Sequence, residues 1–204
     1  MRSILVLLCC AWTQAVSAAP VSVGSYVFDS STFVSNISGT TGSVFSSNSS
    51  STAITDTSAA TYVYSTNSGS IGLSFGNTAI YNGEGADLAL FFLGNTSTVT
   101  VSLSGSTTSR SYTSQYMYMP NGSQYGVQIG NQVYGLSVAV VDLTDLGMST
   151  NQTLGGFNVG LGVNNYMSLV GGFYAQPTSA VPLPAPFILL LSGLAALGMV
   201  GRRK

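Results

Sequence analysis

Leu88-Ala89-Leu90-Phe91-Phe92-Leu93 is apolar at every position, and turn sequences flank it, Asn82-Gly83 before and Gly94-Asn95 after. Neighbouring side chains of a strand point to opposite faces of a sheet, so a strand that is apolar throughout has both faces buried. The stretch is short, as strands are, and too short for an ordinary helix. We therefore predict that residues 88–93 form a central, fully buried strand.

Apolar residues alternate with small or polar ones in several segments on either side, as in strands with one buried face. The alternation is clearest in residues 71–75, 99–103, 136–140 and 157–161, and further strands are expected in residues 26–28, 62–64 and 167–173. Turn sequences such as Gly130-Asn131 separate them, and no helical period is sustained. The sequence predicts one all-β domain in residues 20–178, an antiparallel β-sandwich that is jelly-roll-like.

Charged residues are almost absent from this predicted domain. Its cation is Arg110, and its acidic residues are Asp29, Asp56, Glu84, Asp87, Asp142 and Asp145. Nucleic-acid binding requires lysine and arginine to neutralise phosphate, so nucleic acid is excluded as a partner. Serine, threonine, asparagine and glycine take the place of charges. Such a surface suits contact with polysaccharide, although exported β proteins often have it whatever they bind.

The same composition excludes most catalytic centres. The predicted domain has neither histidine nor cysteine, so it cannot contain a Ser-His-Asp or Cys-His hydrolase site or the usual zinc ligands. A glycosidase needs only two carboxylates about 5–10 Å apart, which Glu84 with Asp87, or Asp142 with Asp145, could provide. Both pairs lie in expected turns, where carboxylates commonly accept hydrogen bonds from backbone N–H groups. We therefore expect no enzyme.

The turn from Asn82 to Asp87 is the candidate for a structural calcium ion, with Glu84 and Asp87 as ligands. Calcium takes six to eight oxygen ligands from carboxylates, carbonyls and water. The turn supplies several such oxygens, and Asp29 could join them if the ends of the domain pair. The alternative is ordinary turn chemistry without a metal. No other cofactor is expected.

Tyrosines concentrate between residues 110 and 134 and give a candidate glycan-binding surface. Tyrosine and arginine present flat apolar faces with polar tips, which suit sugar rings. The residues chosen are Arg110, Tyr112, Tyr116 and Tyr118. The alternative is that these tyrosines only fill strands of a sandwich, with Tyr116 and Tyr118 on one face and the methionines between and after them on the other.

Residues 1–19 have the pattern of a secretory signal peptide. Met1-Arg2-Ser3 is a short positive segment, residues 4–11 are apolar, and the small residues from Val16 to Ala19 offer a cleavage site. Cys9 and Cys10 lie inside the apolar run, and neither follows the small residue that a lipoprotein signal requires, so lipidation is not expected.

Residues 181–204 have the pattern of a second targeting segment. Val181-Pro182-Leu183-Pro184-Ala185 precedes an uncharged apolar run from Phe187 to Val200, and Arg202-Arg203-Lys204 follows. A helix over residues 186–201 would be roughly 24 Å long, a little short of the ~30 Å hydrocarbon core. The three cations are expected to act as a membrane stop and to stay cytoplasmic, with the preceding domain on the far side.

This combination of motif, apolar helix and basic residues resembles the VPLPA variant of the PEP-CTERM sorting signal of exported bacterial proteins. The resemblance implies a Gram-negative host, an exosortase-type processing enzyme as partner, and an inner-membrane-held precursor that is cut near residues 181–185 and moved to the cell surface or matrix. Asn82 to Leu88, followed by Phe91, and Val141 to Gly147 are similar to two segments of PEP-CTERM bodies, which supports the fold but implies no activity.

Taken together, the sequence favours a non-enzymatic, exported cell-surface or extracellular-matrix protein associated with exopolysaccharide. The alternative is a carbohydrate-binding module of the same fold, supported by calcium. A weak glycosidase is the third hypothesis.

Overall fold

The computed structural model describes residues 19–47, 58–76, 78–119 and 121–174, which lie within one compact unit, Ala18–Gln176. The predicted sorting signal of residues 181–204 lies outside the described residues, as does the predicted signal peptide apart from Ala19. Within the described ranges, no helix has the length and apolar character needed to cross a bilayer.

The described unit is all-β, and its strand pairs are antiparallel, which confirms the predicted all-β, antiparallel character. The elements are β1 (Pro20–Val23), β2 (Tyr26–Asp29), η1 (Ser30–Thr32), β3 (Asn36–Ser46), β4 (Val63–Ser74), β5 (Ile80–Tyr81), β6 (Leu88–Leu93), β7 (Thr98–Leu103), β8 (Ser109–Thr113), β9 (Gln115–Tyr116), β10 (Gly126–Ile129), β11 (Gln132–Val141), η2 (Leu143–Leu146), β12 (Thr153–Leu154), β13 (Phe157–Leu161) and β14 (Tyr166–Gly172). The two η elements are short 3-10 helices.

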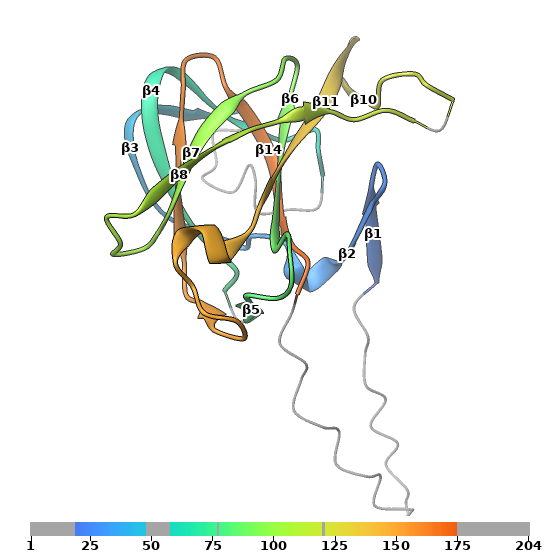
Figure 1. The fold of residues 1–204 in the computed structure, drawn as a ribbon. Helices are drawn as coiled ribbons and strands as arrows, with labels where there is room; N and C mark the ends of the chain where they lie inside the picture. The colour runs from blue at the N-terminus through green and yellow to red at the C-terminus, as the bar shows by residue number, and fades with distance from the viewer. Residues whose placement is uncertain (1–18, 48–57, 77, 120, 175–204) are drawn as a thin grey trace, which may run out of the picture. The chain divides into compact units, whose positions relative to one another are not determined.

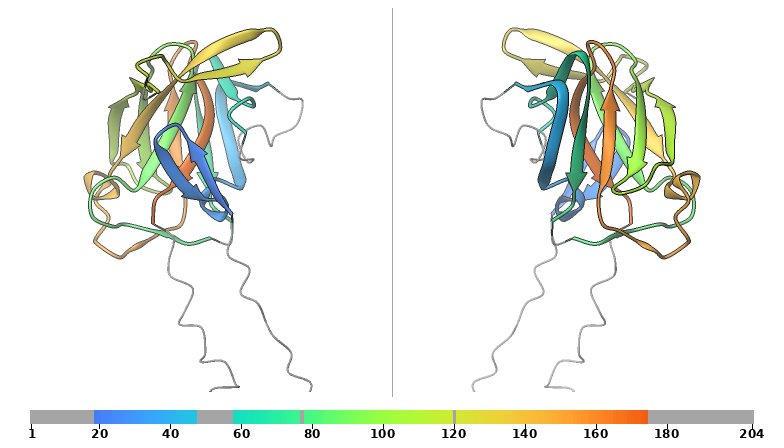
Figure 2. Two further views of the ribbon diagram at one scale, coloured as in Figure 1. Left: turned by 90° about the vertical axis from the view of Figure 1, so that its right-hand side faces the viewer. Right: turned by 90° about the vertical axis from the view of Figure 1, so that its left-hand side faces the viewer.

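Most of the strands form one ten-stranded sheet with two halves. One half contains β10, β11, β6 and β14, with β9 paired to β11, and the other contains β3, β4, β13, β7 and β8. The halves are joined where Tyr166 pairs with Tyr64 and Met167 pairs with Val63, the two register pairs between β14 and β4. Figures 1 and 2 show the sheet curving until it nearly closes on itself.

The predicted central strand is β6, which lies between β11 and β14. Leu88, Leu90 and Phe92 point into the space between the two halves of the sheet, which we call the inner core. The inner core also contains Ile71 and Leu73 of β4, Val99 and Val101 of β7, and Phe157 and Val159 of β13.

The alternate residues of β6 belong to a second cluster on the other face, which we call the outer core. Ala89, Phe91 and Leu93 pack there with Val23, Phe28, Phe33, Met117, Leu136, Val138 and Leu169. The β1–β2 hairpin supplies part of this cover, and its Tyr26 and Phe28 meet Phe91 edge-on, with ring centroids 6.0 and 5.9 Å away. Both faces of β6 are therefore buried, as its sequence requires.

Gly171 and Gly172 of β14 lack side chains, which allows residues of both cores to pack closely against this strand. A Cβ on Gly171 would lie 2.8 Å from ring carbons of Phe28, and a Cβ on Gly172 would lie 2.7 Å from Cδ1 of Ile80. Side chains here would force the packed neighbours away. The glycines thus explain how an outer hairpin and an inner side chain approach the same strand from opposite sides.

Candidate functional site

Asp87, one of the two predicted calcium ligands, is fully buried at the start of β6. Its Oδ1 accepts a hydrogen bond from the backbone N–H of Gly83, and its Oδ2 accepts one from the N–H of Leu143, both at 2.7 Å. Burial raises the pKa of Asp87, while these two hydrogen bonds act in the opposite direction. The carboxylate therefore fastens the 82–87 turn to η2.

Glu84, the other predicted ligand, is exposed, and its backbone carbonyl accepts a hydrogen bond from the Tyr174 hydroxyl at 2.8 Å. Among the described residues, no group of three or more His, Cys, Asp and Glu side chains is arranged to hold a metal ion. The turn chemistry given above as the alternative accounts for the Asp87 carboxylate, and the calcium ion stays a prediction.

Asp142 and Asp145, the second carboxylate pair, lie at η2. Asp142 is the N-cap, and its Oδ1 accepts a hydrogen bond from the N–H of Thr144 at 2.8 Å. Asp145 is in the first turn of η2 and is exposed. Each predicted glycosidase pair thus contains one carboxylate that already organises a turn or caps a helix.

The predicted glycan-binding residues divide between two places. Arg110 and Tyr112, both on β8, lie against η2: Arg110 Nε donates to the carbonyl of Asp145 at 3.2 Å, and the Tyr112 hydroxyl donates to the carbonyl of Asp142 at 3.5 Å. Burial raises the pKa of Tyr112 to about 12, with the negative charges of Asp145 and Asp142 adding to the effect. These contacts hold β8 on η2.

Tyr116 and Tyr118 lie farther along the chain. Between them, Met117 is buried in the outer core, whereas Tyr118 is 63% exposed. The Tyr116 hydroxyl donates to Oδ1 of Asn95 at 3.3 Å. This contact places Tyr116 beside a hollow of the surface that the sequence did not reveal.

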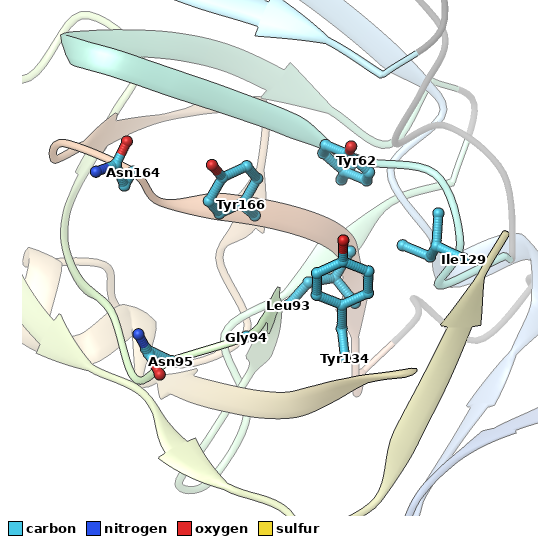
Figure 3. Close-up of a pocket in the computed structure, with 8 residues that line it drawn as sticks. All are labelled: Tyr62, Leu93, Gly94, Asn95, Ile129, Tyr134, Asn164 and Tyr166. Atoms are coloured by element: carbon cyan, nitrogen blue, oxygen red, sulfur yellow. The ribbon is translucent and has the colours of Figure 1, made fainter. Parts of the chain in front are cut away.

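The hollow is a pocket of about 350 Å³, which we call the tyrosine pocket. Its lining residues come from the ends of several strands and from the β13–β14 turn: Tyr62, Leu93, Gly94, Asn95, Ile129, Tyr134, Asn164 and Tyr166. Figure 3 shows the rings of Tyr62, Tyr134 and Tyr166 around the opening, with Asn164 and Asn95 toward one side and Ile129 toward the other. The pocket therefore combines aromatic rings with amide groups.

Local contacts hold these side chains in place. The ring of Tyr62 meets that of Tyr166 edge-on, with centroids 5.7 Å apart. The Tyr134 hydroxyl donates to Oε1 of Gln132 at 2.8 Å. Asn164 has a left-handed backbone with φ of 58°, a conformation that asparagine tolerates, and its N–H donates to the carbonyl of Ser65 at 2.8 Å. The turn thereby presents the Asn164 side chain at the rim.

Charge is distributed unevenly over the domain. The described acidic residues, like Arg110, lie around η1, η2 and the 82–87 turn, and none of the described residues that line the tyrosine pocket is a carboxylate or a cation. Figure 1 shows β5 near one end of the unit and β10 near the other. β6 runs from Asp87 to the pocket, roughly 20 Å at ~3.3 Å per residue, which exceeds the Debye length of about 8–10 Å. The described lining of the pocket is therefore uncharged.

Comparisons with family models, with curated proteins and with solved structures give no match.

Proposed function

We propose that this chain is a non-enzymatic, exported cell-surface or extracellular-matrix protein whose β domain binds an uncharged glycan in the tyrosine pocket. The observation that carries the proposal is the chemistry of the described lining residues, which combine tyrosine rings, hydroxyls and asparagine amides and include no carboxylate or cation. Tyrosine rings can pack against the C–H faces of a sugar, and hydroxyl and amide groups can bond its hydroxyls. A charged ligand would find no charged partner among these described residues.

The pocket is suited to binding because its walls are already held in position. Tyr62 contacts Tyr166, Tyr134 bonds Gln132, and the turn backbone fixes Asn164. Less side-chain freedom is lost on binding when the site is pre-organised in this way. At about 350 Å³ the pocket is near the small end of ligand sites, which suits a short sugar unit.

The remaining parts of the proposal concern export and fold. A Gram-negative host, an inner-membrane-held precursor and cleavage by an exosortase-type enzyme are supported by the resemblance of residues 181–204 to the VPLPA signal. A jelly-roll-like sandwich is supported by the two halves of the sheet, which enclose the inner core and share two register pairs. Association with exopolysaccharide is consistent with both an uncharged glycan as ligand and a location at the cell surface or in the extracellular matrix.

The first test is a binding measurement with Tyr166→Ala. The full chain, purified in detergent, is titrated calorimetrically with neutral oligosaccharides, with detergent alone as the blank. We expect Tyr166→Ala to weaken binding about tenfold or more, because the variant loses one aromatic wall of the pocket. Tyr118→Ala is the matched control, since Tyr118 is an exposed tyrosine that does not line the pocket, and it should bind like the unchanged protein.

Salt provides a second readout of the same experiment. Binding of an uncharged glycan should be nearly independent of ionic strength, whereas an acidic polysaccharide held by charge would bind more weakly as salt rises. The glycan proposal would have to be abandoned if no neutral oligosaccharide bound, or if Tyr166→Ala bound as tightly as the unchanged chain.

The sorting proposal predicts a shortened surface protein. Protein recovered from the host cell surface should lack residues 187–204, because cleavage near Val181 to Ala185 removes the apolar run and the cations. Replacing Arg202 and Arg203 by Glu should impair retention of the precursor, because the membrane stop would be lost. Mass spectrometry of the C-terminus checks both, and an intact Lys204 on surface-exposed protein would refute the cleavage.

A further inference from the structure

Three aromatic residues stand side by side on adjacent strands next to the tyrosine pocket. Phe45 of β3 is the register partner of Tyr64 of β4, and Tyr64 is the register partner of Tyr166 of β14. The rings of Phe45 and Tyr64 have centroids 5.5 Å apart with an interplanar angle of 30°, and those of Tyr64 and Tyr166 are 5.7 Å apart at 19°. We call Phe45, Tyr64 and Tyr166 the aromatic row.

The aromatic row lies on the outside of the sheet. Val63 and Met167, which precede and follow members of the row, point into the inner core, so Tyr64 and Tyr166 point the other way. Phe45 is 48% exposed and Tyr166 is 36% exposed. Strands favour aromatic residues, but a cluster of them left open to water is unusual and marks a contact surface.

The row is continuous with the tyrosine pocket, since Tyr166 belongs to both and Tyr62 contacts both Tyr166 and Tyr64. We propose that the binding site extends along the aromatic row to Phe45 and takes a stretch of several sugar units from a polymeric uncharged glycan. This inference rests on the proposed glycan-binding function. A sugar ring and a tyrosine ring are of similar width, so successive rings of the row offer successive contacts to a chain that leaves the pocket.

The occupant argued for is a polysaccharide, for two reasons. The row contains neither an acidic nor a basic residue, and the described residues that line the pocket contain none either, so one uncharged polymer suits both. Its hydroxyl and ring groups also match the amphipathic faces of sugars better than a purely aliphatic patch would. A second copy of this chain is the competing occupant, because β3 has a strand on one edge only within the described residues.

The test measures how affinity depends on glycan length. The full chain in detergent is titrated with β-1,4-glucan, β-1,3-glucan and β-1,4-mannan oligosaccharides, each from disaccharide to longer oligomers. For the series that binds, affinity should rise about tenfold from the shortest to the longest member, since an added aromatic contact is worth up to about that factor. Phe45→Ala should abolish this rise and leave the affinity for the disaccharide unchanged.

Two further variants make the result specific. Phe45→Tyr should restore the rise with length, because it restores the ring, and Tyr118→Ala should keep the rise, because Tyr118 lies outside the row. Phe45 is half exposed, so Phe45→Ala should melt within a few degrees of the unchanged protein, and a larger shift would show that the residue is structural.

The outcomes separate the two proposals. The extended site would be overturned if Tyr166→Ala weakened binding but affinity did not rise with glycan length. It would also be overturned if Phe45→Ala left the rise with glycan length intact. In both cases the pocket would remain a glycan site. Absence of binding by every series would remove both. Sedimentation that shows a dimer of the unchanged chain and a monomer of Phe45→Ala would assign the row to a second copy and overturn the polysaccharide.

Discussion

Asp87→Ala is expected to lower the free energy of unfolding by about 3–5 kcal/mol, because it removes two hydrogen bonds to a buried carboxylate. The N–H groups of Gly83 and Leu143 would lose their partners, and little water can replace the lost oxygens at a fully buried position. The link between the 82–87 turn and η2 would be broken as well. Urea unfolding followed by circular dichroism measures the loss.

Glu84→Ala is the matched control, because Glu84 is the exposed acidic residue of the same turn. Its effect should stay within about 0.5 kcal/mol, as for most surface substitutions. A chelator added to the unchanged protein tests the alternative role of these residues. If the chelator lowered the melting temperature and Asp87→Ala removed that sensitivity, a bound cation would account for the stability, and the purely structural role of Asp87 would be rejected.

The pH dependence follows from the direction of the Asp87 pKa. Burial, and to a smaller extent the charge of Asp142, raise the pKa in the folded protein above the ordinary value of 3.8. Folding therefore takes up a proton as the pH falls toward 3.8, and this contribution is lost as the pH rises through the folded pKa. Relative to Asp87→Asn, which cannot titrate, the unchanged protein should gain stability on acidification from neutral pH. If the free energy of unfolding of the unchanged protein fell relative to that of Asp87→Asn on acidification, the raised pKa would be contradicted.

The central strand could be predicted because its sequence allows few alternatives. Leu88 to Leu93 must have two buried faces, and β6 does, between the inner and the outer core. The source of the outer cover could not be predicted, because the β1–β2 hairpin is far from β6 in the sequence. Only the folded chain shows that Phe28 fits over Gly171, where the absence of a side chain leaves room.

The candidate site was less accessible to sequence analysis. The tyrosine-rich segment drew attention to Arg110 and Tyr112, which in fact hold β8 on η2. Of the tyrosines in that segment, only Tyr134 lines the pocket, and Tyr116 touches its rim through Asn95. The other pocket residues are separated in the chain and meet because β14 pairs with β4 over two residue pairs, a register that no local pattern specifies.

A signal for the pocket was nevertheless present. Tyr62-Val63-Tyr64 and Tyr166-Met167 both alternate an aromatic residue with an apolar one, so their tyrosines had to share the face opposite to the core. Asn164-Asn165 is also a sequence typical of turns, and Asn164 adopts a left-handed backbone. The sequence did not show that residues 62–64 and 166–167 lie on neighbouring strands, because this depends on the order of the strands in the sheet.

Replacing a phenylalanine by alanine is expected to have a different effect on stability in each core, because the inner and the outer core lie on opposite faces of the sheet. Phe157→Ala removes a fully buried ring from the inner core, where it packs on Phe75 with centroids 5.9 Å apart. β13, which carries it, pairs with both β4 and β7. A cavity at this position should cost about 3–5 kcal/mol and destabilise the domain as a whole.

Phe28→Ala removes a ring of similar size from the outer core, where it contacts Phe33, Phe91 and Phe173 at centroid distances of 5.2, 5.9 and 5.1 Å. The β1–β2 hairpin is a separate two-stranded sheet, and isolated hairpins are marginally stable in water. Losing its main anchor should therefore release the hairpin before the large sheet unfolds. The expected loss is local opening of residues 20–29 with the inner core still protected.

Hydrogen exchange followed by mass spectrometry distinguishes the two results. In Phe157→Ala, exchange should quicken in all strands of the large sheet, because their protection depends on global unfolding. In Phe28→Ala, exchange should quicken in residues 20–29, while β4 and β13 keep the rates of the unchanged protein. Equal acceleration everywhere in Phe28→Ala would mean that the hairpin and the large sheet unfold as one cooperative unit, so that β6 joins the two cores into a single core rather than separating them.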